Sequence, residues 1–154
     1  MTAVIQRVER ASVKADGKQA GECGMGLYVL LGVSAEDTRE DADALAKKIV
    51  NLRIFTDENG KMNRSLLDVD GEMLVVSNFT LMASYRKGNR PDYMSAAAPQ
   101  MANELYEYFT SLCKASVKRV ETGVFGAHMH TDMITDGPVT IVMDSRVLRA
   151  GKKD

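Results

Sequence analysis

The sequence predicts a single α+β domain over residues 1–154, built as a curved mixed β-sheet of about seven strands with two main helices. Three observations lead to this prediction. Strand-like segments outnumber helical ones by about seven to two, and their order is neither a regular βαβ alternation nor all-β. Apolar residues recur at helical spacing in two segments. No internal repeat, low-complexity tract or linker divides the chain, whose length is typical of one domain.

The first part of the chain predicts a hairpin followed by a buried strand. Residues 3–13 alternate between apolar and polar side chains, which indicates a strand. Asp16-Gly17 is a two-residue hairpin turn, and residues 18–22 form the returning strand. The continuous apolar run 27–33 predicts a central strand that is buried on both faces.

The two helices are predicted over residues 39–51 and 96–115, where apolar side chains recur every three or four residues. Asp37 or Thr38 can cap the first helix. Pro99 falls in the first turn of the second helix, where a missing backbone N–H costs nothing.

Further strands are predicted on either side of the second helix. Residues 72–77 form a strongly apolar, buried strand. Shorter strands complete the set at residues 53–55, 117–122, 129–134 and 139–143. The basic residues 146–154 are expected to form a flexible tail.

Residues 135–138, Thr-Asp-Gly-Pro, predict a turn that leads into the last strand. A proline at a strand entrance donates no hydrogen bond, and a Gly-Pro bond can be cis at modest cost. Such a turn holds the carbonyl groups of Gly137 and Pro138 in a rigid, exposed orientation. The alternative is a plain hairpin corner.

Composition excludes several classes of protein. The chain has 20 Lys and Arg against 21 Asp and Glu, which argues against nucleic-acid binding through bulk positive charge. Cys23 and Cys113 lie far apart, so we expect buried thiols in a reducing compartment. No apolar run is long enough to span a membrane, and the N-terminus lacks a signal-peptide pattern. These features predict a cytoplasmic protein.

A candidate site follows the buried strand 72–77. Ser77 and Thr80 carry hydroxyl groups that could act as nucleophiles or as positioning groups. The backbone amides of Phe79 and Thr80 could stabilise an oxyanion. The alternative is that both hydroxyls cap the strand end and that Phe79 belongs to the core.

No conventional catalytic triad or metal site can be assembled. His128 and His130 share one face of a predicted strand, but no third ligand is evident, and we favour a surface or dimer-interface role for them. The sequence predicts neither a metal nor a cofactor.

The segment 85–91 predicts an exposed basic loop directly after the candidate site. Arg86, Lys87 and Arg90 could hold a phosphate backbone near that site. The alternative is a solvated loop without a binding role.

The order and spacing of six segments resemble the D-aminoacyl-tRNA deacylases of the bacterial and eukaryotic type, also known as the D-tyrosyl-tRNA deacylase family. Two of the segments are similar to the family signatures Ser-Gln-Phe-Thr-Leu and Asn-Asp-Gly-Pro-Val-Thr. The segments are MTAVIQRVERAS at 1–12, NLRIF at 51–55, SNFTL at 77–81, RKGNRP at 86–91, GVFGA at 123–127 and TDGPVT at 135–140.

This resemblance implies an enzyme that hydrolyses the ester between a D-amino acid and the terminal adenosine of tRNA, and also glycine mischarged on tRNA-Ala. It implies a homodimer with its two sites at the subunit interface. The Gly137–Pro138 bond would be cis and would enter the partner's site, where the two carbonyls would exclude L side chains. Arg7 would hold this turn across the interface. No membrane is involved.

The resemblance also assigns roles to the segment 77–81. Hydrolysis would be assisted by the 2′-hydroxyl of the terminal ribose, with Thr80 as a positioning group or, alternatively, as the nucleophile. The Phe79 and Thr80 amides and Ser77 would complete the catalytic set, and Leu81 and Asn78 would contact the substrate. Asn78 stands where the family has Gln, on a stem one carbon shorter. Rival hypotheses are a tRNA- or DNA-associated binding module and a general small-molecule hydrolase.

Overall fold

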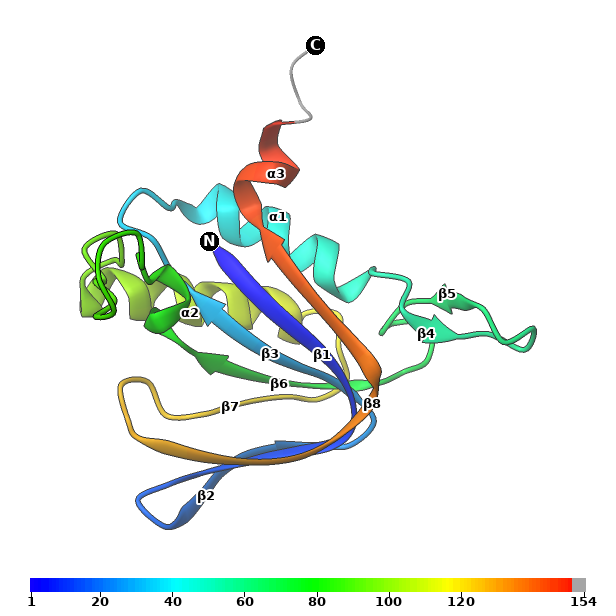
Figure 1. The fold of residues 1–154 in the computed structure, drawn as a ribbon. Coiled ribbons are helices and arrows are strands. Elements are labelled where there is room, and N and C mark those ends of the chain that lie inside the picture. Colours follow the sequence, from blue (N-terminus) through cyan, green and yellow to red (C-terminus); the bar gives the residue numbers. More distant parts are fainter. Residues whose placement is uncertain (151–154) are drawn as a thin grey trace.

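The computed structural model describes residues 1–150 as one domain with a six-stranded mixed sheet and a separate two-stranded ribbon (Figure 1). The helices are α1 (Arg39–Val50), α2 (Pro99–Lys114), α3 (Ser145–Ala150) and the 3-10 helix η1 (Phe79–Met82). The strands are β1 (Thr2–Ala15), β2 (Lys18–Cys23), β3 (Gly26–Gly32), β4 (Phe55–Thr56), β5 (Met62–Arg64), β6 (Glu72–Ser77), β7 (Val120–Thr122) and β8 (Met129–Asp144).

The sheet is organised around β1, which pairs antiparallel with β2, β3 and β8. β3 then pairs parallel with β6, and β6 with β7. The predicted α+β architecture with a mixed, curved sheet is therefore confirmed. The structure has eight strands where about seven were expected. β5 was not predicted, whereas β4 overlaps the strand expected at 53–55, and the two form a small ribbon outside the main sheet.

Helices α1 and α2 lie side by side on one face of the sheet, and the strands curl away from them on the other side (Figure 1). The larger core fills the space between these helices and the sheet, with Leu45, Ile49, Phe109 and Met73 fully buried in it. A smaller core lies inside the curl of the strands, where the buried residues are Val8, Ala11, Val13, Cys23, Tyr28, Leu74 and Val76. Among the described residues, no helix has the length and apolarity needed to cross a membrane.

Strand β8 differs from the prediction of two strands joined by a turn. It runs without interruption through Gly137 and Pro138. Residues 129–135 pair with β1 residues 8–15, and residues 140–144 pair with residues 2–6. The turn residues therefore form an irregularity within one long strand, because β1 offers pairing partners on both sides of it.

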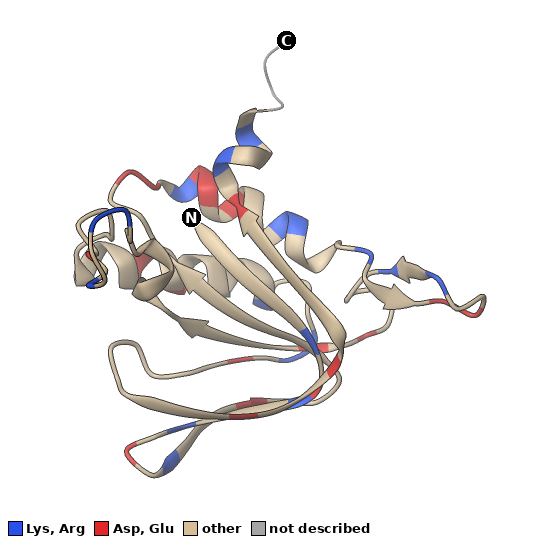
Figure 2. Ribbon diagram, in the orientation of Figure 1, with Lys and Arg blue, Asp and Glu red and all other residues tan. Residues whose placement is uncertain are grey.

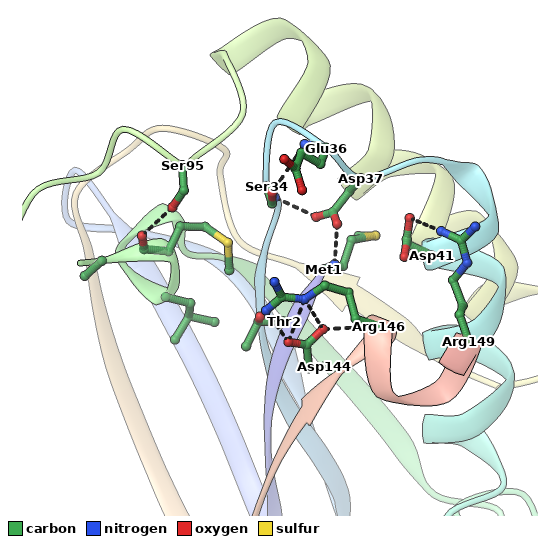
Figure 3. A pocket seen from close by; sticks show the side chains of 13 residues that line it. Met1, Thr2, Ser34, Glu36, Asp37, Asp41, Ser95, Asp144, Arg146 and Arg149 are labelled. Carbon is green, nitrogen blue, oxygen red and sulfur yellow. Dashed lines mark hydrogen bonds and ion pairs between the residues drawn. The ribbon is translucent and has the colours of Figure 1, made fainter. Parts of the chain in front are cut away.

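The expected flexible tail at 146–154 is also wrong over its first five residues, which belong to α3; residues 151–154 lie outside the described part. Asp41 of α1 anchors this helix, because its carboxylate accepts hydrogen bonds from Ser145 Oγ at 2.8 Å and Arg149 Nη1 at 3.0 Å. Figure 3 shows the contact of Asp41 with Arg149 beside a cavity that Met1 and Asp37 also line. Local composition could not predict the helix, since its partners are over a hundred residues away.

Candidate functional site

A cavity of about 740 Å³ opens where β6 ends. Four of the predicted site residues line it: Ser77, Asn78, Phe79 and Thr80. No Asp, Glu, Lys or Arg within residues 1–150 is part of its wall. The cavity therefore offers hydroxyl, amide, imidazole and aromatic groups, but no carboxylate or ammonium group for acid–base chemistry.

The backbone of β3 supports this part of the site directly. The Asn78 amide donates a hydrogen bond to the Leu31 carbonyl oxygen at 2.9 Å. A Cβ placed on Gly32 would lie 2.9 Å from Leu81 Cβ and 3.0 Å from the Asn78 carbonyl oxygen. Because only glycine leaves room for η1 so close to the strand, Gly32 seats the helix that carries Phe79 and Thr80.

The side chain of Asn78 begins η1 and binds Thr80 twice. Its Oδ1 accepts hydrogen bonds from the Thr80 amide at 3.1 Å and from Thr80 Oγ1 at 2.5 Å. The Thr80 amide, which was expected to serve as an oxyanion donor, already donates to Asn78 Oδ1 in this structure. The Phe79 amide donates to no acceptor within residues 1–150.

The cavity walls are mostly apolar and come from distant parts of the chain. Phe79 is 58% exposed and meets the ring of Tyr93 edge to face, with the ring centroids 5.0 Å apart. Across the cavity, the Tyr28 hydroxyl and Thr131 Oγ1 are hydrogen-bonded at 3.1 Å. Burial raises the pKa of Tyr28, so this phenol stays neutral near pH 7. Phe125 completes this wall.

Sequence reasoning missed several of these lining residues, including His128. Its ring lies edge to face with that of His130, with centroids 5.0 Å apart, as their shared strand face predicted. His128 is exposed, which agrees with a surface role, and it also lines the cavity. The position of His128 directly after the segment 123–127 was the available signal. Within residues 1–150, no group of three or more potential metal ligands is found.

The Gly137–Pro138 turn is exposed, and its peptide bond is cis. Arg7 holds the turn: its Nε donates to the Asp136 carbonyl oxygen at 2.9 Å and lies 3.1 Å from Asp136 Oδ2. Its Nη1 donates to the Ile54 carbonyl oxygen at 2.7 Å. We expected Arg7 to hold the turn of a partner subunit, but these contacts are within one chain.

The basic loop projects beside η1, closed by paired backbone hydrogen bonds between Ser84 and Asp92 at 2.8 and 2.9 Å. Arg86, Lys87 and Arg90 are exposed, and within the described residues none of them forms an ion pair. Figure 2 shows their positive charge gathered on this loop. The loop leads directly to Tyr93, which lines the cavity.

Residues 4–144 match the protein family described as D-Tyr-tRNA(Tyr) deacylase. The chain belongs to this family. It is 56% identical over 146 residues to the D-aminoacyl-tRNA deacylase of Thermosipho africanus, covering 95% of this chain and 98% of that one. A solved structure named c-Myc DNA Unwinding Element Binding Protein is 41% identical, with a TM-score of 0.88, over 94% of this chain and 98% of that chain. A probable eukaryotic D-amino acid tRNA deacylase, 18% identical, shares the fold with a TM-score of 0.81 over 94% of this chain and 100% of its own.

Residues suggested by similarity to the deacylase family fall into two separate groups. One group, 77–80, lines the cavity, whereas Leu81 faces a different cavity beside Met82. The other group is Arg7 with Gly137 and Pro138. Arg7 is level with Leu27 on β3, and Ser77 is level with Leu31, a separation of about 13 Å along the strands at 3.3 Å per residue. Within one chain, the turn therefore does not line the cavity.

Proposed function

We propose that this chain hydrolyses the ester that joins a D-amino acid to the terminal adenosine of tRNA, and likewise the glycyl ester on tRNA-Ala. The observation that carries the proposal is the cavity at the end of β6, which combines Thr80 and the unoccupied Phe79 amide with apolar and aromatic walls. A cavity of about 740 Å³ is large enough for an adenosine with an aminoacyl group. Membership of the deacylase family supports the same substrate class.

Catalysis in this cavity would depend on orientation and hydrogen bonding. No carboxylate or lysine of the described chain lines it, and the one lining imidazole, His128, is not hydrogen-bonded to Thr80. The 2′-hydroxyl of the substrate's terminal ribose therefore assists the attack of water on the ester carbonyl. The Phe79 amide stabilises the oxyanion that forms, and Thr80 and Ser77 orient the ester. The ribose 3′-oxygen then leaves with a proton, giving the free amino acid and tRNA.

Chiral selection would require a second copy of the chain. The carbonyls of Gly137 and Pro138 are exposed and do not line their own cavity, so we propose a homodimer in which each turn enters the partner's site. There the two carbonyls would face the substrate α-carbon, where hydrogen or a D side chain fits and an L side chain collides. β8 pairs with β1 alone, and its exposed Ile134 and Val142 offer apolar surface for such an interface.

The loop cations would bind the tRNA. Arg86, Lys87 and Arg90 are exposed on the loop that precedes Tyr93, a cavity residue, and suit the phosphates next to the terminal adenosine. We place this activity in the cytoplasm, where buried free thiols such as Cys23 and Cys113 stay reduced.

A second candidate function is nucleic-acid binding without hydrolysis. The 41% identical solved structure carries the name of a DNA-binding protein, which favours this candidate. The net charge of −1 argues against it, since affinity would rest on the single basic loop.

The test compares deacylation of D-tyrosyl-tRNA, L-tyrosyl-tRNA and glycyl-tRNA without added metal. We expect rapid loss of the D-tyrosyl and glycyl esters while the L-tyrosyl ester survives. Thr80→Ala should lower turnover and leave the dimer intact, as measured by sedimentation. Binding of tRNA with no hydrolysis of any ester would favour the second candidate.

A further inference from the structure

Asn78 and Thr80 form a closed hydrogen-bonded unit at the mouth of the cavity. The Oδ1 atom of Asn78 accepts from both the amide and the hydroxyl of Thr80, at 3.1 and 2.5 Å. We propose that Asn78 is the positioning residue for Thr80, holding its hydroxyl as a hydrogen-bond acceptor toward the substrate. This inference rests on the proposed function, since it specifies how the same site meets its ester.

The direction of the hydroxyl proton follows from the chemistry of the pair. A carboxamide oxygen has no proton to give, so Thr80 Oγ1 must be the donor in the contact with Asn78 Oδ1. The single hydroxyl proton is then committed, and the remaining lone pairs of Oγ1 can only accept. Thr80 therefore meets a donor group of the substrate, and it does not donate to the ester oxygen.

The same contact argues against Thr80 as the nucleophile. A nucleophilic hydroxyl needs a neighbouring base that removes its proton. Asn78 accepts the hydrogen bond but cannot take up the proton at neutral pH, and no Asp, Glu or Lys of the described chain lines the cavity. His128 does line it, but the Thr80 hydroxyl donates to Asn78 Oδ1 and not to the imidazole. The Asn78–Thr80 contact therefore favours a positioning role for Thr80 over a nucleophilic one.

The Asn78–Thr80 contact also decides which backbone amide of the site is free to donate. The Thr80 amide is bound to Asn78, which leaves the Phe79 amide as the backbone donor at this turn. An oxygen on the short Asn stem reaches the amide two residues ahead, as in an Asx turn. A Gln side chain carries its oxygen one carbon further out, so Gln at position 78 would place this acceptor differently.

The decisive experiment is a double-mutant cycle between Asn78 and Thr80, read as single-turnover hydrolysis of D-tyrosyl-tRNA. Asn78→Ala should lower kcat about tenfold, the value of one well-oriented hydrogen bond, with KM within about twofold. In the Thr80→Val background, Asn78→Ala should cost almost nothing more. An equal loss in both backgrounds would mean that Asn78 acts independently of Thr80 and would overturn the proposal.

The variant Asn78→Asp distinguishes the role of the Asn78 Oδ1 acceptor from that of the Nδ2 donors. The carboxylate keeps an acceptor at the position of Oδ1 but loses the Nδ2 donors, so it should recover most of the kcat that alanine loses. If Asn78→Asp is as slow as Asn78→Ala, the Nδ2 group is the active one and the positioning role is wrong. Asn51→Ala is the matched control, because Asn51 also caps a helix, donating to the Lys47 carbonyl oxygen at 2.9 Å, and does not line the cavity.

A second readout does not depend on the esterase activity. Hydrogen exchange of the Thr80 amide, followed by NMR, should speed up about tenfold in Asn78→Ala and return in Asn78→Asp. Unchanged exchange would show that the contact is absent in solution. If the wild-type protein fails to hydrolyse D-tyrosyl-tRNA while the exchange behaves as expected, the proposed function is wrong but the positioning of Thr80 stands.

Discussion

Arg7 on β1 donates a hydrogen bond from Nε to the backbone carbonyl oxygen of Asp136 on β8, at 2.9 Å. Through Nη1 the same guanidinium reaches the Ile54 carbonyl oxygen, at 2.7 Å, so one side chain joins β1, β8 and the segment before β4. The Arg7 side chain is only 11% exposed, and the Asp136 carbonyl that it binds belongs to the backbone next to Gly137. The orientation of the Gly-Pro turn therefore depends on a residue near the start of the chain.

Arg7→Ala should destabilise the protein by about 2 kcal/mol, because it leaves two carbonyl groups without their donor. It should also lower the preference for D- over L-tyrosyl-tRNA, since the turn loses its anchor. Urea unfolding and parallel deacylation assays would measure both effects. Arg10→Ala is the control, because the ion pair of Arg10 with Asp132 is 3.6 Å long and exposed. If Arg7→Ala and Arg10→Ala lower the stability and the D-over-L preference equally, Arg7 has no specific role in holding the turn.

Gly137→Ala should damage chiral selection more than tRNA affinity. A Cβ on Gly137 would lie 2.0 Å from the Val139 amide nitrogen, so the turn must change shape to accept any side chain. We expect L-tyrosyl-tRNA to be hydrolysed more readily relative to the D ester, with the dissociation constant for tRNA unchanged. Gly24→Ala is a suitable control, since its Cβ would come no closer than 3.4 Å to a neighbouring atom. If Gly137→Ala lowers the hydrolysis rates of D- and L-tyrosyl-tRNA in proportion, the role of this turn in chiral selection is contradicted.

The stability of the fold should fall in acid through Asp41. Burial alone would raise the pKa of this carboxyl, but hydrogen bonds from the Thr38 amide, Ser145 and Arg149 outweigh it and lower the pKa from 3.8 to about 2. The ionised form thus stabilises the fold above about pH 4, by about 2 kcal/mol, and this contribution disappears as the pH falls through about 2.

Comparing urea unfolding of the wild type and Asp41→Asn at pH 7 and pH 3 would measure this contribution. The difference in unfolding free energy between the two proteins should shrink by about 1 kcal/mol at the lower pH. Glu40→Gln is the matched control on the same helix, because Glu40 is 75% exposed in its ion pair with Arg149. A difference that does not change with pH would contradict the role of Asp41.

Neutralising the basic loop should weaken tRNA binding without slowing the chemical step. The triple change Arg86→Gln, Lys87→Gln and Arg90→Gln should raise KM, leave kcat nearly unchanged, and reduce the salt dependence of binding by about two in the log–log slope. Lys47→Gln with Lys48→Gln removes exposed charge from α1 and serves as the control. If the control and the loop variant behave alike, the loop has no specific contact with tRNA.

Much of the fold follows from local patterns in the sequence. The helix 39–51 was predicted from its apolar spacing and its cap, and the structure has α1 at Arg39–Val50. The Asp16-Gly17 turn and the buried strands β3 and β6 were also predicted, because turn chemistry and continuous apolar runs are properties of a few neighbouring residues. The order of the short motifs was enough to identify the family. The segment 77–80, which the sequence predicts to form a site, lines the cavity at the end of β6.

Features that depend on distant residues emerged from the packing of the whole chain. β8 continues through Gly137 and Pro138 because β1 pairs with it on both sides, and the sequence around the turn carries no information about that partner. Tyr28 on β3, His128 just before β8 and Thr80 on η1 line one cavity because the curled sheet brings these distant segments together. The Asn78–Thr80 contact joins residues only two apart, yet it depends on side-chain rotamers and on the support of Gly32, which composition and spacing do not specify.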